Sequence, residues 1–238
     1  MNLKNKTIIV TGASDGIGKE IALRLAKDKA NVLILSRNED KLKAVKKEIK
    51  DLGFSAEYYV CDLRKLEDIK STVEKISENH DSIDGLINNA GVWQKLDNIE
   101  NISDQEVMDV LHTNLSGLIL LTKHTMPLLK KSKNAGIINI SSKSGYTAQA
   151  GQSVYTASKY GVRGFTEVLQ QDLKGSGIKV AGVYQAGTNT KMFEKAGEDW
   201  SDDKYRKFIP AEELAEVVAF MISRPEYIWL SEVRVESK

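Results

Sequence analysis

The alternation of short apolar runs with longer helical patterns constrains the fold of this chain more than any other feature. Strand-like runs rich in β-branched and aliphatic residues occur at 7–10, 31–35, 56–60, 83–87, 136–140 and 178–184, with a weaker run at 228–235. Helical patterns lie between them, at 16–29, 39–52, 64–79, 103–131, 153–174 and 211–223. Near-continuous apolar runs are typical of strands buried on both faces. The rhythm therefore predicts an α/β fold, a doubly wound (Rossmann-like) parallel seven-stranded sheet with helices on both faces.

The helical pattern at 103–131 is longer than one usual helix. Ser103 and Glu106 fit a capping box at its start, and Pro127 is expected to end or bend it near Met126. No linker, repeat or low-complexity segment interrupts the chain, so we expect residues 1–238 to form a single domain.

Composition excludes several classes of protein. The net charge of +1 gives no electrostatic case for binding nucleic acid or an anionic membrane, and no apolar run reaches the ~18 residues that a membrane span needs. The single cysteine, Cys61, excludes an internal disulfide and is interpreted as a buried strand residue. A first strand that begins near Lys6, without a signal-peptide core before it, favours the cytoplasm.

A catalytic metal is not expected. The three histidines, His80, His112 and His124, do not have metal-ligand spacing with Cys61 or with paired carboxylates, and they are interpreted as structural.

A glycine-rich turn joins the first strand to the first helix. It contains Gly12, Gly16 and Gly18 in the spacing G-x-x-x-G-x-G, between Thr11 and Gly18. In a doubly wound sheet this turn binds a nucleotide pyrophosphate, because glycines let the backbone approach and the helix N-terminus presents N–H groups. A glycine-rich turn without a ligand is the alternative.

The end of the second strand indicates which cofactor binds. An acid at this position selects NAD by binding the ribose 2′-hydroxyl, whereas an arginine accommodates a 2′-phosphate. Here Ser36 stands in place of an acid and Arg37 follows it. A guanidinium grips phosphate in bidentate fashion, so the sequence predicts NADP(H). The alternative is that Arg37 is a surface residue.

Tyr155 and Lys159 are four residues apart on a predicted helix and should lie side by side. A nearby ammonium favours the phenolate and lowers the pKa of a tyrosine, as a proton-transfer group near neutral pH requires. The spacing alone is common, and a surface tyrosine beside a solvated lysine is the alternative.

Six motifs in order resemble the short-chain dehydrogenase/reductase family, single-domain type, over about residues 5–224. They are the Thr11–Gly18 turn, Asp62, Asn88-Asn89-Ala90-Gly91, Asn114, Ser141-Ser142, and Tyr155 with Lys159. The resemblance implies that Asn114, Ser142, Tyr155 and Lys159 are catalytic. It also implies a cofactor site formed by Gly12, Ser14, Asp15, Gly16, Ile17, Gly18, Arg37, Asp62, Leu63, Asn89, Ala90, Gly91, Tyr155, Lys159, Thr188 and Thr190.

The sequence departs from the family after the sixth strand. The family's Pro-Gly-x-Val-x-Thr is here Gln185-Ala186-Gly187-Thr188-Asn189-Thr190. Thr190 matches, Thr188 takes the valine position, and Gln185 is placed to reach a substrate. Residues from about 188 to 210 are expected to form a lid, with Phe193, Trp200, Tyr205 and Phe208 as its aromatic residues. Expected substrate contacts are Trp93, Gln94, Tyr146, Gln149, Gln185 and Met192, although these side chains could instead pack the lid onto the body.

These features favour an NADP(H)-dependent oxidoreductase acting on a small carbonyl or secondary alcohol, with Tyr155 as general acid/base. One alternative is a 3-oxoacyl-carrier-protein reductase, for which a basic run would serve as the docking patch: Lys123, Lys130, Lys131 and Lys133. An alternative of another class is a catalytically silent NADP(H)-binding regulatory protein. The resemblance also implies a homo-oligomer, a dimer or tetramer, built from the helices at 103–131 and 153–174. Its apolar faces could come from Leu115, Leu118, Leu121, Val162, Phe165 and Leu169, though the same residues could face the sheet.

Overall fold

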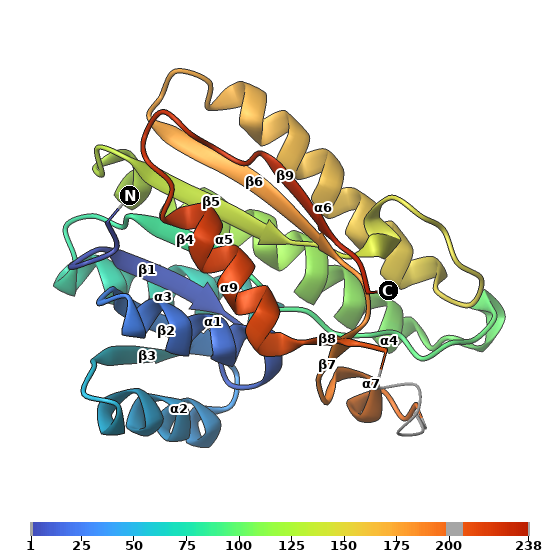
Figure 1. The fold of residues 1–238 in the computed structure, drawn as a ribbon. Helices are drawn as coiled ribbons and strands as arrows, with labels where there is room; N and C mark the ends of the chain where they lie inside the picture. The colour runs from blue at the N-terminus through green and yellow to red at the C-terminus, as the bar shows by residue number, and fades with distance from the viewer. Residues whose placement is uncertain (1, 199–206, 238) are drawn as a thin grey trace.

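Seven parallel strands form one sheet in the order β3-β2-β1-β4-β5-β6-β9 (Figure 1) in a computed structural model, which describes residues 2–198 and 207–237. The strands are β1 (Thr7–Thr11), β2 (Asn31–Ser36), β3 (Ala56–Val60), β4 (Gly85–Asn88), β5 (Ala135–Ile140), β6 (Ile178–Gln185) and β9 (Glu232–Val235). The predicted sheet is confirmed, although β9 is shorter than the run at 228–235 and β4 begins at Gly85. Strand order reverses between β1 and β4, and ligands of doubly wound sheets bind outside the carboxyl ends of the strands at such a point.

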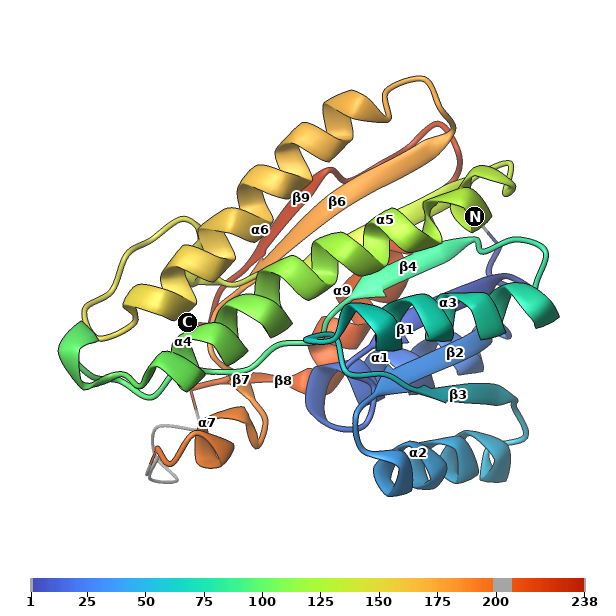
Figure 2. The same ribbon diagram turned by 180° about the vertical axis from the view of Figure 1, so that it is seen from behind.

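Helices cover both faces of the sheet (Figures 1 and 2). One face carries α1 (Gly16–Lys27), α2 (Glu39–Asp51) and α9 (Ala211–Ile222); the other carries α3 (Leu66–Asn79), α5 (Gly117–Lys130) and α6 (Ser153–Asp172). Because side chains alternate along a strand, Ile8 and Val10 pack in the cluster with Ile21 of α1. Ile9 points the other way and packs with Leu121 of α5.

The long helical segment is interrupted where Asn114 stands. Helix α4 (Asp104–Leu111) passes into a π-helical turn (His112–Ser116) and then into α5. π-turns inside helices are frequent at functional sites. At the start of α4 the Ser103 hydroxyl accepts from the N–H of Glu106, which confirms the predicted N-cap, but the Glu106 carboxylate accepts from the N–H of Lys95 rather than closing the capping box.

Pro127, which was expected to end or bend the helix, does not end it. It lies inside α5, which continues to Lys130. A proline this close to the end of a helix removes only one hydrogen bond and leaves few residues to continue. Leu128 and Leu129 after it are buried in the core cluster on that face, and their packing keeps the last turn helical.

The predicted lid region lies beyond the carboxyl ends of the strands. Strand β7 (Thr188–Asn189) pairs in parallel with β8 (Ile209–Pro210), and α7 (Met192–Lys195) follows β7 (Figure 2). Trp200 and Tyr205 lie outside the described residues. Among the helices that the structure describes, none combines the length and the apolar character needed to cross a membrane.

Candidate active site

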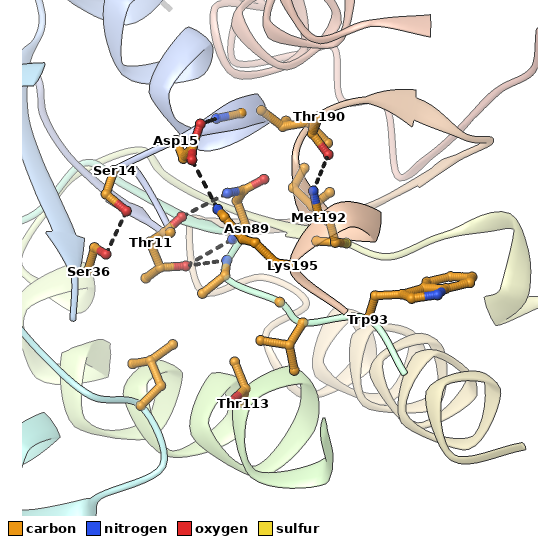
Figure 3. A pocket seen from close by; sticks show the side chains of 18 of the residues that line it. Thr11, Ser14, Asp15, Ser36, Asn89, Trp93, Thr113, Thr190, Met192 and Lys195 are labelled. Atoms are coloured by element: carbon orange, nitrogen blue, oxygen red, sulfur yellow. Dashed lines mark hydrogen bonds and ion pairs between the residues drawn. The ribbon is translucent and has the colours of Figure 1, made fainter. Parts of the chain in front are cut away.

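A cleft of about 360 Å³ opens at the carboxyl ends of the strands, where the glycine turn, the segments after β3 and β4, the start of α6 and the lid meet (Figure 3). Most of the predicted residues line it: Gly12, Ser14, Asp15, Gly16, Ile17, Arg37, Asp62, Leu63, Asn89, Ala90, Gly91, Trp93, Tyr155, Lys159, Gln185, Thr190 and Met192. The cleft wall also includes Thr113 and Lys195, which sequence reasoning missed.

The glycine turn is fastened to the segment after β4. The Thr11 hydroxyl accepts from the backbone N–H groups of Asn89 and Ala90, both at 2.9 Å, and the Asn89 side chain donates to the Thr11 carbonyl at 2.9 Å. A Cβ at Gly18 would lie 2.4 Å from the carbonyl oxygen of Gly12, and Gly12 itself has φ +65°. These two glycines therefore allow the turn, α1 and the segment after β4 to touch.

Asp15 holds the lid against the glycine turn. Its Oδ1 caps α1 by accepting from the N–H of Gly16, and its Oδ2 pairs with Lys41 at 2.9 Å and with Lys195 of α7 at 3.0 Å (Figure 3). Burial opposes ionisation, but the hydrogen bonds from Lys41 and Lys195 keep the pKa of Asp15 well below its usual value. Lys41 and Lys195 carry no motif that would have pointed to this contact.

The part of the cleft beside the ends of β2 and β3 contains two hydroxyls and an ion pair. Ser14 and Ser36 share a hydrogen bond of 2.7 Å (Figure 3), beside Arg37 in the cleft wall. Arg64, which the sequence did not single out, donates to both carboxylate oxygens of Asp62, at 2.7 to 3.1 Å. This hydrogen bonding lowers the pKa of Asp62. The backbone N–H of Arg64 also donates to Asp62 at 3.1 Å, so Arg64 alone makes four contacts with a carboxylate that has about four acceptor positions.

Asn114 fixes the path of the chain after β4. Its Oδ1 accepts from the N–H of Val92 at 2.8 Å, and its Nδ2 donates to the Val92 carbonyl at 2.9 Å and to the Ser158 hydroxyl at 3.2 Å. Asn88, the last residue of β4, donates a side-chain hydrogen bond to the side chain of Asn139 in β5 at 2.8 Å. This bond ties β4 to β5.

Tyr155 and Lys159 lie side by side, as their spacing predicts, with the lysine Nζ 5.6 Å from the centre of the Tyr155 ring. The Lys159 ammonium donates to the Ile140 carbonyl at 3.3 Å, and burial lowers its pKa to about 8. Burial raises the pKa of the Tyr155 phenol to about 12, although the nearby Ser142 hydroxyl acts in the opposite direction. The expected lowering of the Tyr155 pKa is thus wrong in this structure, because loss of solvent around the phenol outweighs its polar neighbours.

An aromatic stack connects the lid to Tyr155. The centre of the Trp93 ring lies 4.5 Å from the centre of the Tyr155 ring and 4.8 Å from the centre of the Phe193 ring in α7. Phe193 in turn lies 5.5 Å from Phe208. These aromatic residues pack the lid onto the body, and Trp93 also forms part of the cleft wall.

Three predicted substrate residues lie elsewhere. Gln94 is fully buried and bonds to the backbone at the start of α6. The Tyr146 hydroxyl donates to Glu236 at 2.6 Å, and its ring faces the Arg234 guanidinium at 4.4 Å, near the C-terminal strand. Gln149 lies on an exposed loop. These corrections share one cause: the direction of a loop side chain depends on distant segments that order along the chain does not reveal.

Four other predicted residues stand behind the cleft wall. Gly18 and Asn114 support it, as described, and Ser142 reaches Tyr155 through its hydroxyl. Thr188 is buried in β7 and donates to the Ala186 carbonyl at 3.2 Å. Thr190, by contrast, lines the cleft, and its hydroxyl accepts from the N–H of Met192 at 3.4 Å (Figure 3).

The cleft wall is suited to a polar ligand. Among the described residues, three that line it have buried polar atoms without a hydrogen-bond partner: Oγ1 of Thr113, Nε1 of Trp93 and Oε1 of Gln185. A buried polar atom without a partner is costly, and a ligand with polar groups would offset that cost. Within residues 2–198 and 207–237, no group of three or more His, Cys, Asp or Glu residues is placed to hold a metal ion.

Fold and site together place the chain in a known class: it belongs to the short-chain dehydrogenase family, whose model matches residues 6–201. An uncharacterised oxidoreductase of Listeria monocytogenes is 32% identical, over 99% of this chain and 97% of its own length. The 3-oxoacyl-[acyl-carrier-protein] reductase FabG of Thermotoga maritima is also 32% identical, over 94% and 92%. Two solved structures are each 29% identical. An actinorhodin polyketide ketoreductase variant with NADPH has a TM-score of 0.89 and covers 98% and 96% of the two chains; a metagenomic short-chain oxidoreductase with NADP has a TM-score of 0.85 and covers 100% of both.

Proposed function

We propose that this chain is an NADP(H)-dependent oxidoreductase that interconverts a small carbonyl compound and its secondary alcohol, with Tyr155 as the general acid/base. The observation that carries this proposal is the grouping of the Tyr155 phenol with the buried ammonium of Lys159, 5.6 Å from the centre of its ring, at the wall of one cleft, with the Ser142 hydroxyl near the phenol. A hydride donor and a proton donor are the two requirements of carbonyl reduction, and this arrangement supplies the second.

Ser14, Ser36 and Arg37 support the choice of NADP(H) over NAD(H). Ser36 and Arg37 lie at the end of β2, where an acid would be needed to bind an unmodified ribose, and Ser14 of the glycine turn is hydrogen-bonded to Ser36. Relatives solved with NADPH and with NADP have the same fold over almost the whole chain. We assign the pyrophosphate to the glycine turn at the N-terminus of α1, the adenine to Asp62 and Leu63, and the nicotinamide ribose to Lys159.

The proposed chemistry follows from the side chains around Tyr155. NADPH, when bound, supplies the hydride. The hydroxyls of Ser142 and Tyr155 donate to the carbonyl oxygen and stabilise the negative charge that develops on it. Tyr155 then transfers its proton to that oxygen, and the positive charge of Lys159 favours the resulting phenolate. Asn114 keeps the chain around Val92 in place and is proposed to anchor a water linked to Lys159.

The high pKa of Tyr155 keeps the phenol in the protonated form that ketone reduction requires. With a pKa of about 12, Tyr155 is protonated throughout the neutral range and is ready to act as an acid. Oxidation requires the phenolate, which is scarce at neutral pH.

The carrier-protein alternative receives mixed support. FabG of Thermotoga maritima has that activity in its name and covers most of this chain. Of the expected basic docking run, Lys123 lies in the middle of α5, whereas Lys130, Lys131 and Lys133 lie at its C-terminal end and just beyond it, before β5 begins. That is the amino end of the sheet, opposite to the cleft (Figure 2), so this run does not form a docking patch at the cleft.

A panel of substrates distinguishes the proposed ketone reductase from the carrier-protein reductase and from a silent binding protein. Free ketones, aldehydes and a 3-oxoacyl carrier protein are each assayed with NADPH and with NADH. The proposal expects turnover of free ketones with a preference for NADPH. Turnover of the carrier-linked substrate alone would establish the alternative, and cofactor binding without turnover of any substrate would establish a silent binding protein.

We also propose a cytoplasmic homo-oligomer. Three of the residues expected to form its apolar faces are buried within the protomer: Leu118, Leu121 and Val162. The apolar side chains exposed on α4 and α6 are instead Met108, Tyr160 and Val168. The mass from light scattering at micromolar concentration tests this proposal, and a monomer would contradict it.

A further inference from the structure

Gln94 is a fully buried polar residue that the proposed chemistry does not use. Its side chain is 0% exposed, and all its hydrogen bonds go to backbone groups at the start of α6. Its Oε1 accepts from the N–H groups of Val154 at 2.9 Å and Tyr155 at 3.0 Å, and its Nε2 donates to the Gly151 carbonyl at 3.2 Å. One side-chain oxygen therefore holds the backbone of the proposed acid/base itself.

This contact replaces an ordinary helix cap. The first N–H groups of a helix have no partner within the helix, and the N-cap side chain usually accepts from one of them. In α6 the N-cap residue is Gln152, but its side-chain oxygen accepts instead from the Ser144 hydroxyl at 3.0 Å. Gln94, some sixty positions earlier, supplies the acceptor, and the partial negative charge of its oxygen suits the positive end of the helix.

The residues next to Gln94 act on the same tyrosine. Asn114 holds both backbone groups of Val92, and the ring of Trp93 packs against the ring of Tyr155 at 4.5 Å. The segment that follows the cleft-lining Asn89–Gly91 thus determines both the backbone position and the ring position of Tyr155.

We propose that Gln94 is a positioning residue for Tyr155. It anchors the first turn of α6 so that the phenol meets the Ser142 hydroxyl and lies beside Lys159. This inference rests on the proposed function, because it assigns the anchoring a purpose in proton transfer. A small displacement of a reacting group can cost on the order of 100-fold in rate, whereas the cofactor site, formed mainly by other segments, should be little affected.

The test compares two substitutions of Gln94 that differ in hydrogen bonding. Gln94→Met keeps the approximate size but removes the acceptor, and Gln94→Glu keeps an acceptor for both N–H groups. We expect Gln94→Met to lower kcat about 10- to 100-fold, to leave the Kd for NADPH within about 2-fold, and to shift the pH profile of kcat. Gln94→Glu is expected to retain kcat within about 3-fold. Gln149→Met, at the exposed glutamine, is the matched control and should resemble the wild type.

Amide exchange separates positioning from general stability. Exchange at Val154 and Tyr155 should become at least about 10-fold faster in Gln94→Met, together with the loss of kcat. Faster exchange with unchanged kcat would overturn the inference, as would a folded Gln94→Met enzyme with kcat within about 2-fold of wild type. If Gln94→Met fails to fold, Gln94→Asn, whose amide is one methylene too short to reach α6, undergoes the same measurements. A wild-type protein without turnover refutes the proposed function, whereas an active wild type with an unaffected variant refutes this inference alone.

Discussion

The ammonium nitrogen of Lys159 lies 5.6 Å from the centre of the Tyr155 ring and donates a hydrogen bond to the Ile140 carbonyl at the end of β5. Burial moves the two pKa values apart, because it raises the pKa of the phenol to about 12 and lowers that of the ammonium to about 8. Both shifts favour the neutral forms, but below about pH 8 the phenol is neutral while Lys159 keeps its positive charge.

Replacing Tyr155 with Phe should abolish turnover and spare cofactor binding. The variant keeps the ring that packs on Trp93 but lacks the proton donor, so kcat should fall at least about 1000-fold. The Kd for NADPH should stay within about 3-fold. Steady-state kinetics and a binding titration measure the two quantities. Tyr146→Phe is the control, since its hydroxyl pairs with Glu236 away from the cleft; substantial reductase activity in Tyr155→Phe would contradict the proposed role.

Ketone reduction should decline as the pH rises above about 8. The Lys159 ammonium, with a pKa lowered to about 8 by burial, is charged below that pH and loses its proton as the pH increases through it. The neutral amine no longer favours the developing phenolate, so kcat/KM at saturating NADPH should be flat below pH 8 and fall above it. Lys159→Arg, which stays charged, should lose this decline. An identical decline in the arginine variant would assign the titration to another group.

Arg37→Ala should reduce the preference for NADPH. The guanidinium is proposed to bind the 2′-phosphate, which NADH lacks, so the ratio of the two Kd values should change about 10- to 100-fold through weaker NADPH binding. Fluorescence titration with both cofactors measures the ratio. Lys43→Ala is the matched control, because Lys43 pairs with Glu39 on the exposed side of α2. An unchanged ratio of the two Kd values in Arg37→Ala would contradict the proposal that Arg37, just after β2, binds the 2′-phosphate.

Lys195→Ala should loosen the lid without altering the glycine turn. Lys195 and Lys41 pair with the same oxygen of Asp15, but only Lys195 belongs to α7. The KM for the ketone should rise about 2- to 5-fold in Lys195→Ala and remain close to wild type in Lys41→Ala. Because these side chains are largely exposed, the effect should shrink as salt is added. Equal KM values in the two variants would show that the ion pair does not hold the lid.

Gly18→Ala should destabilise the fold by about 1–3 kcal/mol or more, as overpacking does. The added Cβ would lie 2.4 Å from Gly12 and from the Asn89 side chain. Gly164→Ala is the contrast, because a Cβ at this helix position would meet no described atom within 4 Å. The second change should stabilise by about 0.5–1 kcal/mol. Urea unfolding of both variants measures these free energies, and a neutral Gly18→Ala would contradict the close packing.

The sheet and the glycine turn at the N-terminus of α1 could both be predicted from the sequence. Buried strands need apolar residues on both faces, so β1, β2 and β5 were visible as continuous runs. Gly12 and Gly18 were visible because close approach and positive φ both require glycine. The spacing of Tyr155 and Lys159 depends only on helix geometry, which is local.

Features that depend on distant contacts were beyond sequence reasoning. Gln94 followed a cleft-lining motif and was expected in the pocket, yet its side chain turns toward the first turn of α6. The pairing of Arg64 with Asp62 and the attachment of Tyr146 to Glu236 likewise depend on how loops fold back. The pKa of Tyr155 depended on burial, which the spacing of two residues cannot give.

The position of Trp93 between Tyr155 and Phe193 makes this residue a natural optical reporter. Its indole contacts the phenol on one side and the lid on the other, so its emission should respond both to occupancy of the cleft and to movement of α7. Trp229 is bonded to the Val180 carbonyl on β6 and is not among the residues that line the cleft. Spectroscopic changes lost in Trp93→Phe would therefore report the cleft, and lid closure could be timed by stopped flow without any attached dye.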